Sequence, residues 1–150
     1  MSERQQPWSD RRVERGRILV LSDNPISRAL TTIATAAGRE VLVEAEDDGG
    51  PGLDPGAGDA VVLCDHDAPD APAVLRAALA SEAGYVAMMA SRGRAAGLLD
   101  ELGAEGVDVS TLHVPAGHDL GGKAAGEIAL SVVAEIVAES YDRPGGPMRG

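Results

Sequence analysis

The chain has 150 residues, a length that suits one domain with a substantial buried core. Its 24 acidic and 13 basic residues give a net charge of -11, which argues against binding to nucleic acid, because contacts to the phosphate backbone need Lys and Arg. The single cysteine, Cys64, excludes an internal disulfide and a zinc site made of several thiolates.

The chain shows no sign of a membrane span or a secretory signal. No stretch approaches the roughly 18 uncharged apolar residues that a spanning helix needs. Residues 1–16 are polar and carry both signs of charge, without the apolar run of a signal peptide. We therefore expect a cytoplasmic protein with a disordered arm over residues 1–16, a Rossmann-like domain over 17–140 and a disordered tail over 141–150.

Apolar runs alternate with helical patterns between these ends. Five short runs have the composition and the turn residues at their boundaries that are typical of buried strands. The predicted strands are residues 17–22, 40–44, 60–64, 85–89 and 111–114. The predicted helices are residues 25–37, 72–81, 94–103 and 126–140. The segment 47–58 is rich in Gly and Pro, which predicts a loop where a crossover helix often lies.

This alternation predicts right-handed βαβ crossovers. The expected fold class is α/β, a three-layer Rossmann-like fold with a mostly parallel five- or six-stranded sheet. Ligands of such sheets bind at the carboxyl ends of the strands. We therefore examined the loops that follow the predicted strands for candidate binding residues.

The first loop occupies the place of a dinucleotide-binding fingerprint. The three glycine positions of that fingerprint are Ser22, Asn24 and Ser27 here. Ser and Asn are small, and Asn tolerates a left-handed backbone. Asp23, however, would place a carboxylate near an incoming phosphate. Two interpretations follow: an altered nucleotide loop, or an ordinary helix start with Asp23 or Asn24 as its cap.

The loop after the fourth predicted strand contains Ser91, Arg92 and Arg94. A Ser and two Arg just before a helix can hold an anion through backbone N–H groups and a guanidinium. The alternative is that Ser91 caps the helix and that both arginines are solvated.

The loop after the third predicted strand reads Cys64-Asp65-His66-Asp67. Two carboxylates and an imidazole could bind a metal or shuttle protons. The spacing matches no dedicated zinc motif, so we assign no metal site. We expect Cys64 to be buried and inert.

The segment from Pro115 to Gly122 is rich in glycine and carries His118 and Asp119. Glycines allow the backbone to approach a ligand closely. The same segment could equally be a flexible connection to the last helix.

Two stretches resemble the C-terminal Rossmann domain of xanthine dehydrogenase accessory factors, the XdhC/CoxI family. Residues 78–92 (ALASEAGYVAMMASR) resemble the family segment that ends in Gly-Ser-Arg. Residues 113–122 (HVPAGHDLGG), followed by 127–131 (EIALS), resemble its Pro-x-Gly-x-Asp-x-Gly loop and last helix. The family's Gly-Ala-Gly-type loop is Ser22-Asp23-Asn24 in this chain, and Ala90 replaces the Gly before Ser-Arg.

The resemblance implies an accessory or maturation factor, non-catalytic by itself, for a molybdenum hydroxylase of the xanthine or carbon monoxide dehydrogenase type. It implies binding of the molybdenum cofactor, with NAD or another nucleotide as the alternative ligand. The implied partner is the hydroxylase or a companion accessory subunit, and dimer formation is left open. The candidate cofactor-binding residues are Ser22, Asn24, Ser27, Ser91, Arg92, Gly117 and Asp119.

The order of the acidic residues also resembles a response-regulator receiver. Asp23 lies in an acidic opening loop, and Asp65 follows the third strand, where a receiver has its phosphoacceptor. Val114 replaces the lysine that a receiver needs before Pro115. A third interpretation is a ligand-free module that binds only other proteins.

Overall fold

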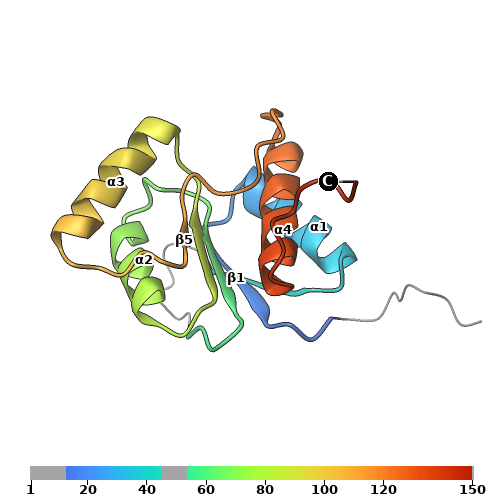
Figure 1. Cartoon of the computed structure of the whole chain (residues 1–150), viewed down its shortest axis with the longest axis horizontal. Coiled ribbons are helices and arrows are strands. Elements are labelled where there is room, and N and C mark those ends of the chain that lie inside the picture. Colours follow the sequence, from blue (N-terminus) through green and yellow to red (C-terminus); the bar gives the residue numbers. More distant parts are fainter. Residues whose placement is uncertain (1–12, 45–53, 150) are drawn as a thin grey trace, which may run out of the picture.

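A computed structural model of the chain describes residues 13–44 and 54–149. Within these residues, five strands and four helices follow one another in the predicted order (Figure 1). They are β1 (Arg17–Leu21), α1 (Pro25–Ala36), β2 (Glu40–Glu44), β3 (Ala60–Leu63), α2 (Ala71–Ala80), β4 (Tyr85–Met88), α3 (Arg92–Ala104), β5 (Leu112–His113) and α4 (Ala125–Ser140). The predicted elements are confirmed, and the largest displacement is at α3, which begins at Arg92 rather than at Arg94.

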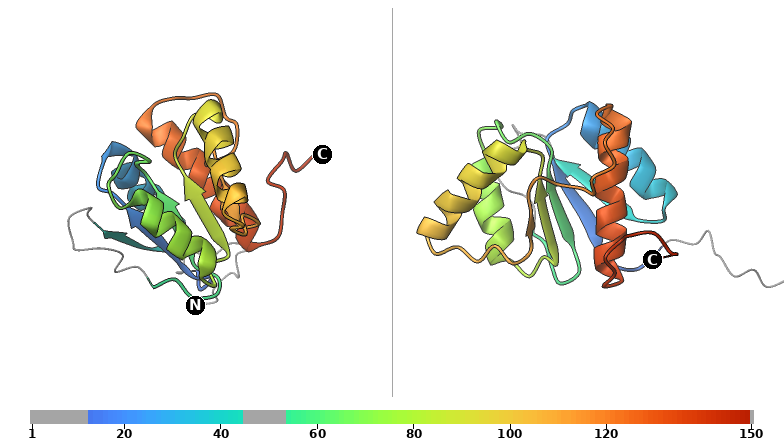
Figure 2. Two further views of the ribbon diagram at one scale, coloured as in Figure 1. Left: turned by 90° about the vertical axis from the view of Figure 1, so that its left-hand side faces the viewer. Right: turned by 45° about the horizontal axis from the view of Figure 1, so that its top comes forward.

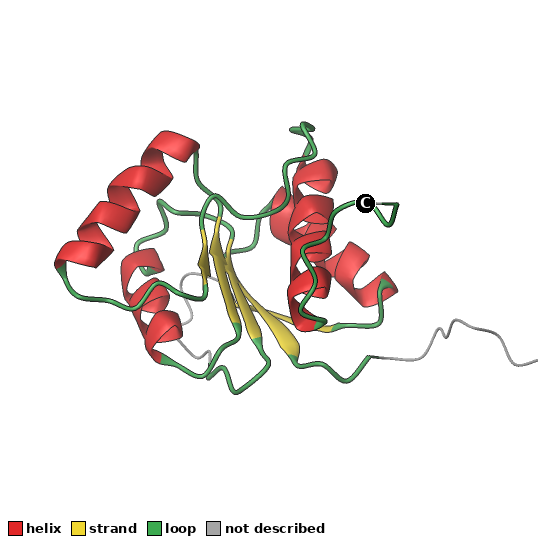
Figure 3. Ribbon diagram, viewed as in Figure 1, coloured by secondary structure: helices red, strands yellow, loops and turns green. Residues whose placement is uncertain are grey.

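The strands form one parallel sheet in the order β2-β1-β3-β4-β5. Helices α1 and α4 cover one face of the sheet, and α2 and α3 cover the other (Figures 1 and 2). Figure 3 shows the sheet as the middle layer between the two pairs of helices. The three-layer, Rossmann-like α/β fold is therefore confirmed, with five strands in the described part of the chain.

Two apolar clusters hold the layers together, and alternate residues of the central strands β1, β3 and β4 supply most of them. Ile18 and Val20 of β1 pack toward α1 and α4, whereas Leu19 and Leu21 pack toward α2 and α3. Both sets are at most 3% exposed. A central parallel strand is buried on both faces, and this explains the unbroken apolar runs in the sequence.

The amino end of β1 is fixed by an ion pair between Arg17 and Asp59. Asp59 is 5% exposed and accepts hydrogen bonds from Nε and Nη2 of Arg17 at 3.2 and 2.6 Å. It also accepts one from the backbone N–H of Arg17 at 2.8 Å. Burial raises the pKa of Asp59, but the hydrogen bonds from Arg17 and Gly56 outweigh this effect and hold the pKa below its ordinary value. The guanidinium fork of Arg17 is thereby filled by a carboxylate.

Some predictions fall on residues that the structure does not describe. Residues 47–53 of the predicted loop lie outside the described part, whereas residues 54–58 form no helix or strand, as predicted. Residues 1–12 of the predicted arm and residue 150 of the predicted tail also lie outside it, so the disorder of both ends stays a prediction. None of the four helices in the described part has the length and apolar character that crossing a bilayer demands.

Candidate functional site

A cleft of about 790 Å³ lies at the carboxyl edge of the sheet. The loops that follow β1, β3, β4 and β5 line it, together with the first half of α4. The chain passes from β1 to β2 on one side and continues with β3 on the other, so the strand order reverses between β1 and β3. Open α/β sheets bind their ligands at such a switch point.

Asn24 joins the two loops at the switch point. Its side-chain oxygen accepts hydrogen bonds from the backbone N–H groups of Ile26 and Ser27, both at 3.0 Å. Its side-chain nitrogen donates to the carbonyl oxygen of Cys64 at 3.1 Å. Asn24 is therefore the N-cap of α1, which confirms the interpretation of this loop as a capped helix start. Its side chain lines the cleft, and both of its polar atoms have protein partners.

Ser22 and Ser27 do not line the cleft. They are 1% and 0% exposed, and the hydroxyl of Ser27 accepts a hydrogen bond from the backbone N–H of Asn24 at 2.8 Å. Ser22 has a φ of 84°, in the left-handed region that favours glycine. Its hydroxyl has no hydrogen-bond partner among the described residues. The backbone thus adopts a glycine-like turn at Ser22, although serine occupies the position.

Ser91, Arg92 and Asp119 meet at the mouth of the cleft. The hydroxyl of Ser91 accepts from the backbone N–H of Arg94 at 3.2 Å and caps α3. The guanidinium of Arg92 lies 3.6 Å from the carboxylate of Asp119, and the two side chains are 86% and 81% exposed. Arg94 instead binds Asp67 at 2.7 Å. The capping interpretation of Ser91 is confirmed, and Arg92 and Asp119 face each other as a solvated pair.

Gly117 lies behind the cleft, against α4. Its φ is 95°, and a Cβ at this position would lie 2.3 Å from the hydroxyl of Ser131. Its backbone N–H donates to the carboxylate of Glu135 at 3.0 Å. The next N–H, of His118, donates to the carbonyl oxygen of Ser131 at 3.2 Å. Glycine is needed here because the loop packs directly on α4, and Gly117 is absent from the residues that line the cleft.

A half-buried acid that was not predicted from the sequence, Glu135, holds this loop in place. The carboxylate of Glu135, 14% exposed, accepts from the hydroxyl of Tyr85 at 2.5 Å and lies 3.6 Å from Nδ1 of His113. The rings of Tyr85 and His113 stack with centroids 4.4 Å apart. One sequence pattern could have predicted this role: Glu135 lies between Val132 and Ile136, on the face of α4 that contacts the sheet.

Burial and hydrogen bonding act in opposite directions on this acid. Burial raises the pKa of Glu135, but His113, Tyr85 and the N–H of Gly117 together lower it to about 2. The contact with Glu135 raises the pKa of His113 above its ordinary value. Burial is the main reason that the pKa of Tyr85 is strongly raised, so its hydroxyl keeps its proton and donates.

The loop after β3 is explained by local contacts. Potential ligand atoms of Asp65, His66 and Asp67 lie within 4.8 Å of one another. However, Asp65 accepts from the backbone N–H of Asp67 at 2.9 Å, as in an Asx turn, and Asp67 is bound by Arg94. Nδ1 of His66 donates to the carbonyl oxygen of Met89 at 3.0 Å, because a carbonyl only accepts. We therefore assign no metal to these three side chains.

Cys64 is 5% exposed, as expected from the sequence. Burial raises the pKa of its thiol to about 12, so the thiol stays protonated near neutral pH. A protonated thiol is a poor nucleophile and a poor metal ligand.

Comparisons with known proteins agree with this architecture. The family model described as the XdhC Rossmann domain matches residues 18–136. No curated protein matches the chain. A crystal structure described as a xanthine dehydrogenase from Bacillus halodurans has the same fold, with a TM-score of 0.70 and 20% sequence identity over 86% of this chain. The chain spans only 44% of that protein. The match to the family model covers most of the sequence, and the chain therefore belongs to the XdhC Rossmann-domain family.

Proposed function

We propose that this chain is an accessory factor of a molybdenum hydroxylase and that the cleft at the carboxyl edge binds the molybdenum cofactor. The family and the similar crystal structure support the link to molybdenum hydroxylases. The observation that carries the binding proposal is the placement of a solvated arginine, Arg92, at the first residue of α3 and at the mouth of the cleft.

The mouth of the cleft suits the phosphate of such a ligand. The Arg92–Asp119 pair is exposed and separated by 3.6 Å, and solvated pairs of this kind are weak. A phosphate dianion can therefore displace Asp119 from Arg92. The first backbone N–H groups of α3 and the macrodipole of the helix add to the attraction. Lys123, the only lysine of the chain, lines the same cleft.

The interior of the cleft suits a flat heterocycle. Ile26, Met89 and Ile128 give it an apolar wall, and the carboxylate of Asp65 can accept hydrogen bonds from ring N–H groups. A volume of about 790 Å³ falls in the range of small-molecule and cofactor sites. When bound, the cofactor would supply the dithiolene that holds molybdenum, while this chain would bind, orient and shield it.

The predicted set of seven residues is narrowed by this geometry. Ser91, Arg92 and Asp119 are proposed to contact the ligand, with Asn24 at the floor of the switch point. Ser22, Ser27 and Gly117 are proposed to act behind these residues, by holding the first and last loops in position.

Calorimetric titration of the full chain with purified molybdenum cofactor, under anaerobic conditions, tests the proposal. We expect binding that Arg92→Ala weakens about tenfold, the usual worth of one charge-assisted hydrogen bond. Arg28→Ala is the matched control, because Arg28 also forms an exposed ion pair, with Asp23, and does not line the cleft.

Parallel titrations with NAD⁺ and GTP distinguish the alternative ligands. The proposed cofactor should bind more tightly than either nucleotide. Tighter binding of NAD⁺ or GTP would assign the cleft to a nucleotide, and no binding of any of the three would favour a module that contacts only proteins. Equal affinity of the wild type and Arg92→Ala for the cofactor would show that the cofactor does not bind in this cleft.

A further inference from the structure

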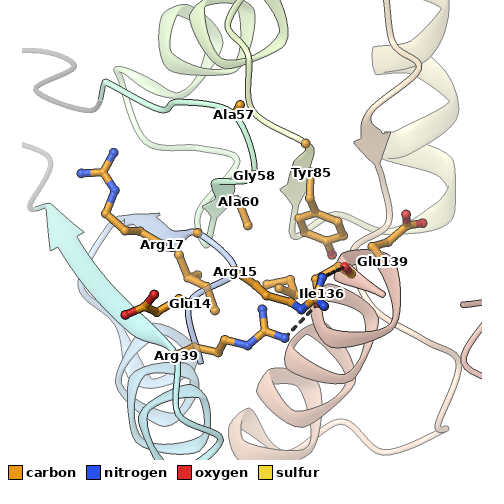
Figure 4. Close-up of a pocket in the computed structure, with 14 residues that line it drawn as sticks. Glu14, Arg15, Arg17, Arg39, Ala57, Gly58, Ala60, Tyr85, Ile136 and Glu139 are labelled. Atoms are coloured by element: carbon orange, nitrogen blue, oxygen red, sulfur yellow. Dashed lines mark hydrogen bonds between the residues drawn. The ribbon is translucent and has the colours of Figure 1, made fainter. Parts of the chain in front are cut away.

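A second pocket, of about 450 Å³, lies at the opposite edge of the sheet, beside the amino ends of β1, β3 and β4. Arg15, Arg17 and Arg39 line it, together with Tyr85 and the end of α4 (Figure 4). Two guanidinium groups, those of Arg15 and Arg39, therefore lie close together (Figure 4) in a chain whose net charge is -11. The proposed cofactor cleft does not include any of these residues.

Arg39 is buried without a full set of partners. It is 4% exposed, and its Nη2 donates to the hydroxyl of Ser140 at 2.9 Å. Its Nε–H has no acceptor among residues 13–44 and 54–149. Buried polar groups nearly always have a hydrogen-bond partner, and an unpaired donor on a charged group is especially costly.

Arg17, elsewhere in this fold, shows which partner the Nε and Nη2 atoms of a guanidinium bind. Its Nε and Nη2 both donate to the carboxylate of Asp59. Arg39 presents the same pair of nitrogens, with Nη2 on a neutral hydroxyl and Nε unpaired. An oxyanion at Nε of Arg39 would give this guanidinium a negatively charged acceptor, as the carboxylate of Asp59 does for Arg17.

A second cation lies next to Arg39. The guanidinium of Arg15 stacks on the ring of Tyr141 at 4.0 Å, and that of Arg39 lies 6.0 Å from the same ring. Arg15 also donates to the carbonyl oxygen of Ser140 at 3.1 Å. In Figure 4 the side chains of Arg15 and Arg39 converge beside Ile136 of α4, whereas the guanidinium of Arg17 points away.

These two cations repel each other in the absence of an anion. Burial lowers the pKa of Arg39, the nearby Tyr141 acts in the opposite direction and raises it, and the charge of Arg15 adds a smaller lowering effect. The carboxylates that line the pocket are those of Glu14, which is exposed, and Glu139, which lies 3.7 Å from Nε2 of His113. An anion between Arg15 and Arg39 would relieve the repulsion and satisfy the unpaired donor.

We propose that the pocket at the amino edge of the sheet binds the oxyanion group of a small molecule, a phosphate or a carboxylate. Nε–H of Arg39 is the central donor, and Arg15 supplies the second positive charge at the entrance. Because the chain is strongly acidic overall, binding depends on these close contacts rather than on long-range attraction.

The Nε–H resonances of the arginines, followed by ¹⁵N–¹H NMR on the full chain, test this proposal. Inorganic phosphate and succinate are titrated separately, at constant ionic strength maintained with chloride. We expect the Arg39 signal to shift and saturate with at least one of the two anions, and the preferred anion identifies the ligand class. The signal of Arg28, which pairs with Asp23 on the surface, is the internal control and should not saturate.

Two variants locate the bound anion. Arg39→Lys keeps the charge but removes the fork, and it should weaken binding at least about tenfold. Arg15→Ala changes an exposed side chain, so it should fold normally and also weaken binding. Arg76→Ala, whose guanidinium pairs with Glu101 and Glu105 outside both the cleft and this pocket, should bind the anion like the wild type. If neither anion moves the Arg39 signal beyond that of Arg28, or if both pocket variants bind like the wild type, the proposal is wrong.

Discussion

Removal of the Glu135 side chain is expected to destabilise the fold strongly. Its carboxylate accepts from the hydroxyl of Tyr85 and the N–H of Gly117 and lies beside His113. Glu135→Ala leaves the hydroxyl of Tyr85, a residue only 4% exposed, without its acceptor. One unsatisfied buried group costs about 1–3 kcal/mol, and breaking a fully buried charged pair costs about 3–5 kcal/mol. The Glu135 and His113 side chains are 14% and 22% exposed, so we predict a smaller loss, of about 2–4 kcal/mol, in the free energy of unfolding.

Urea denaturation of the wild type and the variant measures this loss. Asp100→Ala is a suitable control, because it removes one exposed carboxylate from α3 and should change stability by less than about 0.5 kcal/mol. Tyr85→Phe combined with Glu135→Ala tests the mechanism, since residues in one network are not additive. The double variant should be less destabilised than the sum of the two single variants. A loss below about 1 kcal/mol for Glu135→Ala, or strict additivity of the two substitutions, would show that Glu135 does not stabilise the fold through Tyr85.

The same network makes stability depend on pH with a defined sign. The pKa of Glu135 falls from its ordinary value of 4.5 to about 2 in the folded chain, a difference that corresponds to about 3 kcal/mol. This contribution is complete above pH 4.5 and is lost as the pH falls toward 2. The pKa of His113 is raised above 6.5, so its contribution is complete below pH 6.5 and is lost as the pH rises through the folded value. Glu135→Gln should flatten both limbs of a stability profile, and unchanged limbs would contradict the assignment.

Three further results are expected. Gly117→Ala should lower the free energy of unfolding by about 1–3 kcal/mol, because its Cβ would lie 2.3 Å from the hydroxyl of Ser131 in a left-handed turn. Gly93→Ala is the control, since a Cβ there meets open space and should not lower the stability. Equal denaturation midpoints of the two variants would contradict this prediction. Cys64 should react with a thiol reagent only as the chain unfolds, and fast labelling of the native protein would show that the thiol is accessible. A small phosphodonor with Mg²⁺ should not label Asp65, since Val114 replaces the lysine of a receiver; stable labelling, checked by mass spectrometry, would revive that alternative.

Most of the fold was predictable because its signals are local. Buried parallel strands need unbroken apolar runs, and these runs mark β1, β3 and β4 in the sequence. The start of α1 was also readable, since Asn24 followed by Pro25 is a typical cap and first turn. The sheet order was not predicted, because it depends on which strands pair across the fold rather than on any one segment.

The candidate site was only partly predictable for the same reason. Strand-end placement predicted that Ser91, Arg92 and Asp119 lie near one another, and the three line one cleft. Matching positions to a glycine fingerprint cannot show which way a side chain points, and Ser22 and Ser27 turn inward. The role of Glu135 escaped notice because it depends on partners distant in sequence, such as Tyr85.

The affinity of the full chain for the molybdenum cofactor, compared between one variant at each edge of the sheet, shows which edge binds the cofactor. Arg92→Ala alters the carboxyl-edge cleft, and Arg39→Lys alters the amino-edge pocket. Arg92→Ala should weaken cofactor binding about tenfold, and Arg39→Lys should leave it unchanged. Loss of cofactor affinity in Arg39→Lys, with full affinity in Arg92→Ala, would show that the cofactor binds at the amino edge of the sheet instead.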